Sequence, residues 1–151
     1  MQRPSVTSFY LAGPSAIRLE MSEKAHVLTS YGMRWIGGWD WTRITDDDLT
    51  SLVSKAGCVA GDICAAVGAD LFAAYAMPGQ GLTLGAAAEF GARIGSSREA
   101  HVILNGSVDH VFFHHPCVIR HKDWDAFLIW AIKNFGLVYK PKPSDRLPQV
   151  K

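Results

Sequence analysis

Short apolar runs alternate with longer segments of helical periodicity along most of the chain. The runs at residues 8–13 (SFYLAG), 33–39 (MRWIGGW), 70–77 (DLFAAYAM) and 101–106 (HVILNG) are associated with turn residues and predict buried strands. A short fifth strand is predicted within residues 111–120. Strands of this length that alternate with helices are typical of parallel βαβ units. The pattern therefore predicts an open α/β sheet of about five strands with helices on both faces.

The segments between these runs carry apolar residues three and four positions apart, which is the spacing of one helix face. Helices are predicted at residues 15–31, 45–68, 81–95 and 124–135, and the second contains two glycines that favour a break, Gly57 and Gly61. Hydroxyl residues suited to cap the first three helices are Ser15, Thr45 and Thr83. Apolar residues share one face of the last helix: Phe127, Leu128, Ala131 and Ile132.

Ligands of an open parallel sheet bind beyond the carboxyl ends of its strands. Three predicted loops fall on this edge, at residues 13–15, 37–41 and 77–83. Tyr10 lies on the strand before the first loop, and Glu89 lies in the helix after the third. We therefore expect both side chains near the same crevice.

Composition and charge narrow the classes of function. The 151 residues fit one domain (1–139) followed by a Pro-rich, charged tail (140–151), which we expect to be poorly ordered unless a partner subunit holds it. The formal net charge of +1 gives no electrostatic case for a nucleic-acid polymer or a membrane surface. No apolar run approaches the roughly 20 residues of a membrane helix.

The cysteines favour a reducing compartment. Cys58, Cys64 and Cys117 are odd in number and lack CxxC spacing, so we expect neither a disulfide framework nor a zinc site. Inert, partly buried thiols in a cytoplasmic protein are the expectation.

The stretch GLTLGAAAEFGARIG (residues 81–95) holds one acid, Glu89, among small and apolar residues. A capping role is excluded by spacing, because with Thr83 as N-cap the reciprocal carboxylate belongs at Ala86. An ion pair with Arg93 four residues later would contribute about 0.2–0.5 kcal/mol on an exposed face. Gly85 and the alanines leave space for a ligand, which such a pair does not require. The residues alone leave the structural and the functional interpretation open.

Three further groups have two interpretations each. Asp62 lies in an apolar stretch near a predicted helix end, where the dipole disfavours an acid, so it belongs either to a solvated turn or to a site. Tyr10 is either a core residue or a residue of the crevice. The tryptophans at alternate positions pack in the core or stack on a planar base: Trp35, Trp39 and Trp41.

Adjacent histidines, His114 and His115, raise the question of a metal site. Neighbours on a strand point to opposite faces, and no acid accompanies them at ligand spacing. We therefore expect no metal there.

Three stretches together resemble the nucleoside 2-deoxyribosyltransferase family, which includes hydrolases of nucleoside 5′-monophosphates. They are FYLAGP (residues 9–14), DICAAVGADLF (residues 62–72) and GAAAEFG (residues 85–91). The resemblance runs from about residue 8 to 105, roughly two thirds of the chain. It implies a flavodoxin-like three-layer sandwich, with a parallel sheet of about five strands and helices on both faces.

The resemblance also implies roles for individual residues. Glu89 matches the family's nucleophilic glutamate, and Asp62 matches the aspartate that contacts the base and helps its protonation. Tyr10 matches the aromatic residue whose hydroxyl holds the nucleophile. The implied reaction is a retaining displacement at the anomeric carbon, with a covalent glycosyl-glutamate and no metal or organic cofactor.

One position departs from the deoxyribosyltransferases proper. Six residues before the glutamate they carry an aspartate and the monophosphate hydrolases a serine, whereas this chain has Thr83. A hydroxyl at a helix N-terminus beside Gly85 suits a phosphate, and it equally suits a plain N-cap. Ser15 and Arg18 in GPSAIR (residues 13–18) resemble the hydrolases' other phosphate contacts, and Gly13 beside them is expected to bind substrate.

The resemblance implies a small-molecule nucleoside or nucleotide substrate and a homo-oligomer in which a neighbouring subunit completes the pocket. Hydrolase and transferase activities both remain open. So does a non-catalytic nucleotide-binding or oligomerisation module of the same fold, because the family aspartate is missing and the sequence diverges after Asn105. A glycosidase for another nucleotide such as NAD is a third interpretation.

Overall fold

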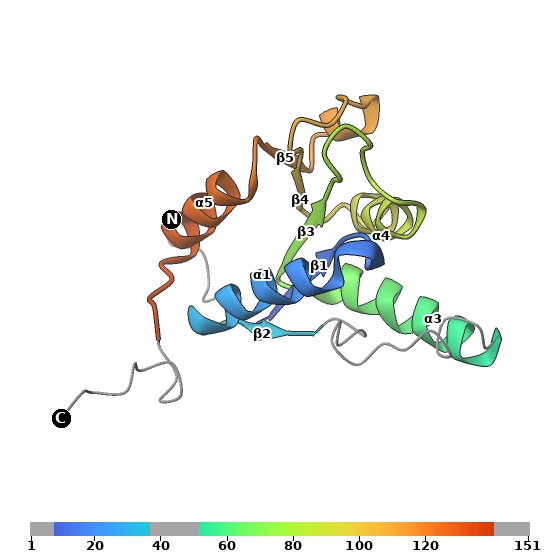
Figure 1. Ribbon diagram of the computed structural model, residues 1–151, viewed down its shortest axis with the longest axis horizontal. Coiled ribbons are helices and arrows are strands. Elements are labelled where there is room, and N and C mark those ends of the chain that lie inside the picture. The colour runs from blue at the N-terminus through green and yellow to red at the C-terminus, as the bar shows by residue number, and fades with distance from the viewer. Residues whose placement is uncertain (1–7, 37–51, 141–151) are drawn as a thin grey trace.

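Two of the predicted strands, β1 (Ser8–Ala12) and β3 (Leu71–Tyr75), are buried along their whole length in the computed structural model. The structure describes residues 8–36 and 52–140, and within residues 52–59 the backbone alone. β1 and β3 join β2 (Arg34–Trp35), β4 (Ala100–Ile103) and β5 (Val118–His121) in one parallel sheet of order β2-β1-β3-β4-β5 (Figure 1). The predicted flavodoxin-like α/β fold is confirmed.

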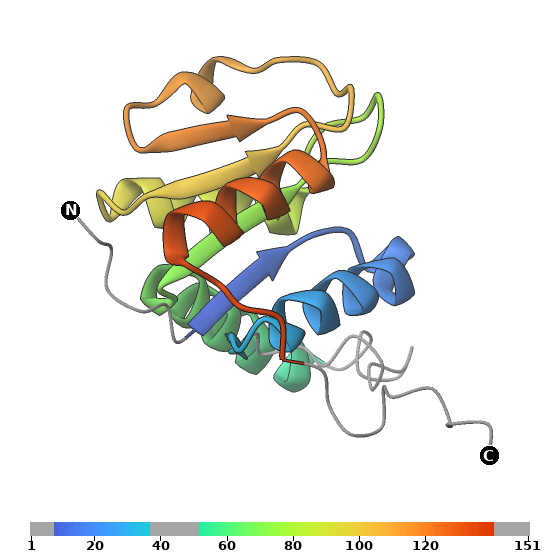
Figure 2. The same cartoon turned by 90° about the vertical axis from the view of Figure 1, so that its left-hand side faces the viewer.

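Helices cover both faces of this sheet. α1 (Arg18–Ser30) and α5 (Trp124–Phe135) lie on one face, and α3 (Leu52–Gly68) and α4 (Leu84–Gly95) lie on the other (Figure 2). Each face has its own apolar core, which explains why the central strands are apolar at every position rather than at alternate ones. Along β1, Phe9 and Leu11 enter the α1/α5 core, and Tyr10 and Ala12 enter the α3/α4 core.

The strand order reverses between β1 and β3, which are hydrogen-bonded neighbours. The chain leaves β1 toward α1 on one face and leaves β3 toward α4 on the other. The two connections therefore separate at the carboxyl edge of the sheet, where a crevice forms in folds of this type. This edge is where the sequence places Tyr10 and Glu89.

Two predicted helix starts have different outcomes. Thr83 caps α4 as expected, with its hydroxyl accepting a hydrogen bond from the Ala86 amide at 3.4 Å. The prediction for Ser15 is wrong, because residues Ser15–Ile17 form a 3₁₀ turn, η1, and α1 begins at Arg18 without a side-chain cap. The turn is closed by the Ile17 amide, which donates to the Pro14 carbonyl at 3.2 Å.

Other boundaries are also corrected. α3 continues without a break through Gly61. The predicted strand at residues 111–120 is a strand only in β5, because Val111–His114 form a second 3₁₀ turn, η2.

His114 does have an acid beside it, with its Nε2 2.6 Å from Oδ2 of Asp109, so the sequence interpretation missed this exposed pair.

Several predictions lie outside the described residues. They concern the loop at residues 37–41 with Trp39 and Trp41, the helix start at Thr45, the tail at residues 141–151 and the side chain of Cys58. Of the other cysteines, Cys117 is half-buried, whereas Cys64 is exposed rather than buried. Across residues 8–36 and 52–140, no helix is long and apolar enough to cross a membrane.

Two histidines are buried between the sheet and α5. His101 on β4 and His121 on β5 stack with Nδ1 of the first 2.8 Å from Nε2 of the second. The ring of Trp130 lies 4.4 Å from the His101 ring, and Nε2 of His101 lies 3.1 Å from a carboxylate oxygen of Glu99. Burial, with a smaller contribution from His101, lowers the pKa of His121 to about 4. His121 is therefore neutral in the folded protein at neutral pH.

We expect acid to destabilise the fold through this pair. The unfolded chain binds a proton at His121 near the ordinary pKa of 6.5, whereas the folded chain binds it only near pH 4, so stability falls as the pH drops from 6.5 toward 4. The loss attributable to His121 is about 1–2 kcal/mol once residual solvent access is allowed for. Thermal unfolding of wild type and His121→Gln at pH 7 and pH 5 measures it. His121→Gln should show the smaller drop in Tm, and the control His26→Gln, at an exposed position of α1, should behave like wild type. Equal drops in wild type and His121→Gln would refute this assignment.

Candidate active site

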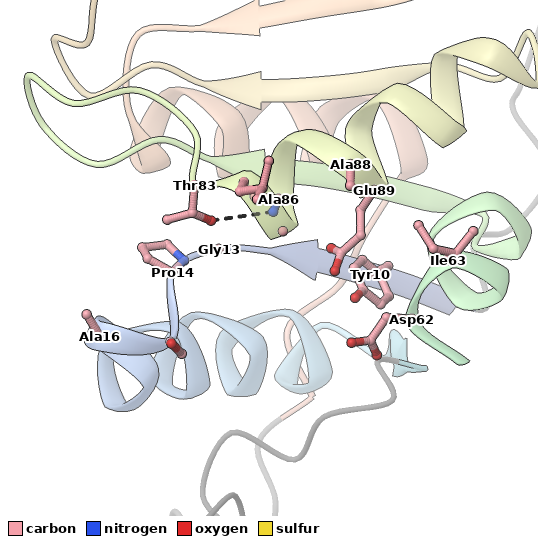
Figure 3. A pocket seen from close by; sticks show the side chains of 13 residues that line it. Tyr10, Gly13, Pro14, Ala16, Asp62, Ile63, Thr83, Ala86, Ala88 and Glu89 are labelled. Atoms are coloured by element: carbon pink, nitrogen blue, oxygen red, sulfur yellow. Dashed lines mark hydrogen bonds between the residues drawn. The ribbon is translucent and has the colours of Figure 1, made fainter. Parts of the chain in front are cut away.

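A cavity of about 480 Å³ opens between the loop after β1 and the first turns of α4 (Figure 3). Its volume is in the range of small-molecule sites. Seven of the eight sequence-predicted site residues line it: Tyr10, Gly13, Ser15, Asp62, Thr83, Gly85 and Glu89. Arg18 is the exception, since it begins α1 and is exposed outside the cavity wall.

Three polar side chains from three different elements point toward one another in this cavity (Figure 3). Tyr10 comes from the middle of β1, Asp62 from α3 and Glu89 from the second turn of α4. Asp62 is only 6% exposed and lies inside a continuous helix. The interpretation of Asp62 as a solvated turn residue is therefore wrong.

A hydrogen bond joins Tyr10 to Glu89. Burial raises the pKa of the Tyr10 hydroxyl well above its ordinary value, and the charges of Glu89 and Asp62 raise it further. The hydroxyl therefore stays protonated and donates to the carboxylate. Tyr10 is therefore the donor and Glu89 the acceptor of this bond.

The environment of Glu89 makes this carboxylate easy to protonate. Burial raises its pKa to about 7, the hydrogen bond from Tyr10 lowers it, and the charge of Asp62 raises it. The hydrogen bond from Tyr10 thus cancels only part of the rise in pKa that burial causes. Glu89 therefore titrates near neutral pH, in the range of functional carboxylates.

The proposed surface ion pair of Glu89 with Arg93 is not what the structure shows. Arg93 is 2% exposed and turns its guanidinium to the end of α3. Its Nη1 lies 3.1, 3.0 and 2.6 Å from three carbonyl oxygens, those of Ala66, Val67 and Ala69, while Nε donates to Glu99 O at 2.8 Å. The structural interpretation of Glu89 as half of a surface pair is therefore wrong.

The mouth of the cavity is formed by backbone and small side chains. A Cβ on Gly13 would lie 2.6 Å from Cε of Met21, so glycine allows the loop after β1 to pack directly on α1. Across the mouth, Thr83 accepts from the Ala86 amide and keeps its own hydroxyl hydrogen for a ligand. Among the described residues that line the cavity, none has a basic side chain. An anion held here would depend on hydroxyls and on the amides at the start of α4.

The cavity wall also contains residues that the sequence did not single out. They are mostly small or apolar: Pro14, Ala16, Ile63, Leu84, Ala86 and Ala88. Such residues carry no chemical signal in a sequence, because the same types fill any core. Ile63 and Ala88 were detectable solely as neighbours of the two acids. Together the six residues give the cavity an apolar surface that is suited to a planar ring.

No family model matches this chain, and no curated protein matches it either. Among solved structures, the chain is similar to the CMP N-glycosidase BcmB of Clostridium botulinum, with 14% sequence identity and a TM-score of 0.50. The alignment covers 82% of this chain and 97% of that chain. The fold is shared with a nucleotide N-glycosidase. At this identity the likeness extends to the arrangement of sheet and helices, and it supports the resemblance drawn from the sequence at the level of the fold.

Proposed function

We propose that this protein cleaves the N-glycosidic bond of nucleosides or their 5′-monophosphates, with Glu89 as the nucleophile. The observation that carries the proposal is the convergence of Glu89, Asp62 and the Tyr10 hydroxyl in one cavity. The fold shared with a CMP N-glycosidase adds support. Two carboxylates and a hydroxyl beside an apolar wall are sufficient for this chemistry without a metal or an organic cofactor.

In the proposed reaction, the ionised Glu89 attacks the anomeric carbon as the bond to the base nitrogen breaks. Positive charge develops on the sugar in an oxocarbenium-like transition state, and a carboxylate beside it is stabilising. The product is a glycosyl ester of Glu89. Tyr10 holds the carboxylate during the attack through their hydrogen bond. Partial desolvation of Glu89 keeps it reactive, since less water has to leave it.

Asp62 is proposed to assist the departing base. The electron pair of the broken bond passes to the base nitrogen, so a hydrogen bond or proton supplied to the base stabilises the leaving group. Water then attacks the glycosyl ester and regenerates Glu89, which gives a hydrolase. A second free base in place of water gives a transferase. Both outcomes retain the configuration at the anomeric carbon because two displacements occur.

A monophosphate would be held at the mouth of the cavity. Thr83, Ser15 and the amides around Gly13 and Gly85 are the groups proposed to receive it. Because no basic side chain joins them among the described residues lining the cavity, we expect the preference for a monophosphate over a nucleoside to be modest for one isolated chain.

A panel of deoxynucleosides, ribonucleosides and their 5′-monophosphates tests the proposal. Each compound is incubated with the protein, with and without a second free base, and the mixture is separated by chromatography. Base released without an acceptor indicates a hydrolase, and a new nucleoside formed with an acceptor indicates a transferase. Binding by calorimetry without turnover of any compound at high enzyme concentration would overturn the proposal in favour of a non-catalytic nucleotide-binding module.

We expect Tyr10→Phe to move the pH dependence of turnover. The variant loses the hydrogen bond that lowers the pKa of Glu89, while it keeps the ring that stacks on Phe72 at 5.9 Å. The acidic limb of kcat/KM should therefore move up by about one pH unit, with about a 10-fold loss at pH 6 and little loss at pH 8.5. Tyr75→Phe is the matched control, because the Tyr75 hydroxyl donates to Glu20 on the opposite face of the sheet. An unmoved limb in Tyr10→Phe would contradict the role of Tyr10.

A further inference from the structure

Arg93 is a buried cation on the face of α4 that packs against the end of α3. It lies one helical turn beyond Glu89 on α4, and its guanidinium reaches Ala66, one helical turn beyond Asp62 on α3. Three of the four hydrogen bonds of Arg93 thus join α4 to the end of α3, about one helical turn beyond the two acids. At that point one side chain bridges α4 and the end of α3.

The same guanidinium also supports the tyrosine of the site. Its Cζ lies 5.9 Å from the centre of the Phe72 ring, and Phe72 stacks on Tyr10 with an angle of 8° between the rings. Phe72 and Tyr10 are also paired in register across β3 and β1. A continuous series of contacts therefore runs from Arg93 through Phe72 to Tyr10, and from the Tyr10 hydroxyl to Glu89.

Arginine is suited to this position in a way that lysine is not. The last carbonyls of a helix have no partner within it, and a cation at that end is favoured by the helix dipole. A planar guanidinium can donate to several of these carbonyls at once and still lie over an aromatic ring. An ammonium group can supply the charge and some of the bonds, but it lacks the second kind of donor, the Nε–H, with which Arg93 also reaches the Glu99 carbonyl.

We infer that Arg93 is a positioning residue, which holds Asp62 on α3 and Tyr10 on β1 at working distance from Glu89 on α4. This inference rests on the proposed N-glycosidic reaction for its catalytic consequence. Its structural content, that Arg93 controls the surroundings of the Glu89 carboxylate, does not depend on turnover and can be measured without it.

Arg98 offers a matched control in the same chain. Its Nη1 donates to the Val67 carbonyl at 2.6 Å, so it is also an arginine at the end of α3. It lies beyond the end of α4 and is more exposed than Arg93. Replacing Arg98 removes a charge and a carbonyl partner from this helix end without removing the contact between Arg93 and Phe72.

The experiment compares Arg93→Lys and Arg93→Gln with Arg98→Lys and Arg98→Gln by two readouts. The first is a ¹³C NMR titration of the Glu89 carboxyl, whose signal is assigned by its absence in Glu89→Gln. The second is kcat and KM on whichever nucleoside or nucleotide the wild type cleaves. The NMR titration needs no substrate, so it decides the inference even where base release is undetectable and the proposed function fails.

For Arg93→Gln we expect the Glu89 titration to shift by about half a pH unit or more, because the burial of Glu89, its hydrogen bond from Tyr10 and its distance from Asp62 all depend on how α4 lies against β1 and α3. kcat should fall about 10- to 100-fold with KM changed less than about 3-fold, since misplacement affects the transition state more than binding. Arg93→Lys should recover part of the wild-type Glu89 titration and part of the wild-type kcat. The Arg98 variants should match wild type in both quantities.

A Glu89 titration in folded Arg93→Gln that matches the Arg98 variants would overturn the inference, as would equal losses of kcat in both series. Where both Arg93 variants fail to fold, Phe72→Leu provides the test, because it removes the ring between Arg93 and Tyr10 and leaves the carbonyl contacts in place. We expect Phe72→Leu to shift the Glu89 titration away from that of wild type. An unmoved titration there would overturn the inference as well.

Discussion

Glu89→Gln is expected to abolish base release, with kcat at least about 10⁴-fold below wild type. The amide is nearly the same size as the carboxyl and can still accept the hydrogen bond of Tyr10, so the cavity keeps its shape. It lacks the charge and the nucleophilicity that the displacement requires. Chromatography of the released base at pH 8 measures the effect. Turnover within a few-fold of wild type would show that Glu89 is not the nucleophile.

The same variant is expected to be more stable than wild type in alkali, which distinguishes a lost nucleophile from a lost fold. The folded pKa of Glu89, about 7, lies above the ordinary 4.5, so the folded state loses stability as the pH rises from 4.5 through 7. Glutamine does not titrate and escapes this loss. We expect a gain of about 1–2 kcal/mol at pH 8, allowing for solvent at the open side of the cavity, and a much smaller gain at pH 4. The exposed Glu23→Gln on α1 is the control and should show neither effect.

Asp62→Asn is expected to lower turnover of natural nucleosides or nucleotides by about 10²- to 10⁴-fold. The loss should depend on the leaving group, because Asp62 is proposed to assist the base as it departs. A p-nitrophenyl deoxyriboside releases a stable phenolate that needs no proton, so the same variant should lose less than about 10-fold with it. The ratio of the two losses, measured by steady-state kinetics, is the quantity that reports on Asp62.

Asp70→Asn provides the comparison for this ratio. Asp70 follows α3 and accepts hydrogen bonds from the backbone amide and the hydroxyl of Ser8, both at 3.0 Å, away from the cavity wall. The variant Asp70→Asn should lose turnover equally with both substrates, even where it lowers the stability of the fold. Equal losses of Asp62→Asn with both substrates would mean that Asp62 places the substrate and takes no part in the departure of the base.

The fold could be predicted from the sequence because its central strands are covered on both faces. This makes β1 and β3 apolar at every position, and such runs are distinct from the surrounding helices. α5 was predicted at its observed bounds because its apolar spacing is regular, and the structure adds that Asp123 and Gly136 cap its two ends. The crevice followed from topology alone, and the structure places Tyr10, Asp62 and Glu89 together in it.

Other features depend on partners that leave no signal in a sequence. Arg93 donates to backbone carbonyls, and every residue has one. The sequence around it, GARIG (residues 91–95), therefore does not distinguish a buried arginine that bonds to a helix end from a surface arginine in an ion pair. The pairing of His101 with His121 requires the register of β4 against β5, which a single sequence does not supply. Ser15 was assigned as a helix cap because its residue type fits, whereas a tight turn after Pro14 postpones the helix.

The two carboxylates sit within helices and Tyr10 within a strand, whereas Gly13 and Ser15 occupy a connection and Thr83 and Gly85 border another. Under the proposed function, the reacting groups and the groups that recognise the substrate thus lie in parts of the fold that tolerate substitution very differently. Connections accept replacement, insertion and drift, while an acid buried between packed helices does not. Proteins with this fold can therefore change the group that they bind at the mouth of the cavity and keep the buried carboxylates and their proposed chemistry unchanged.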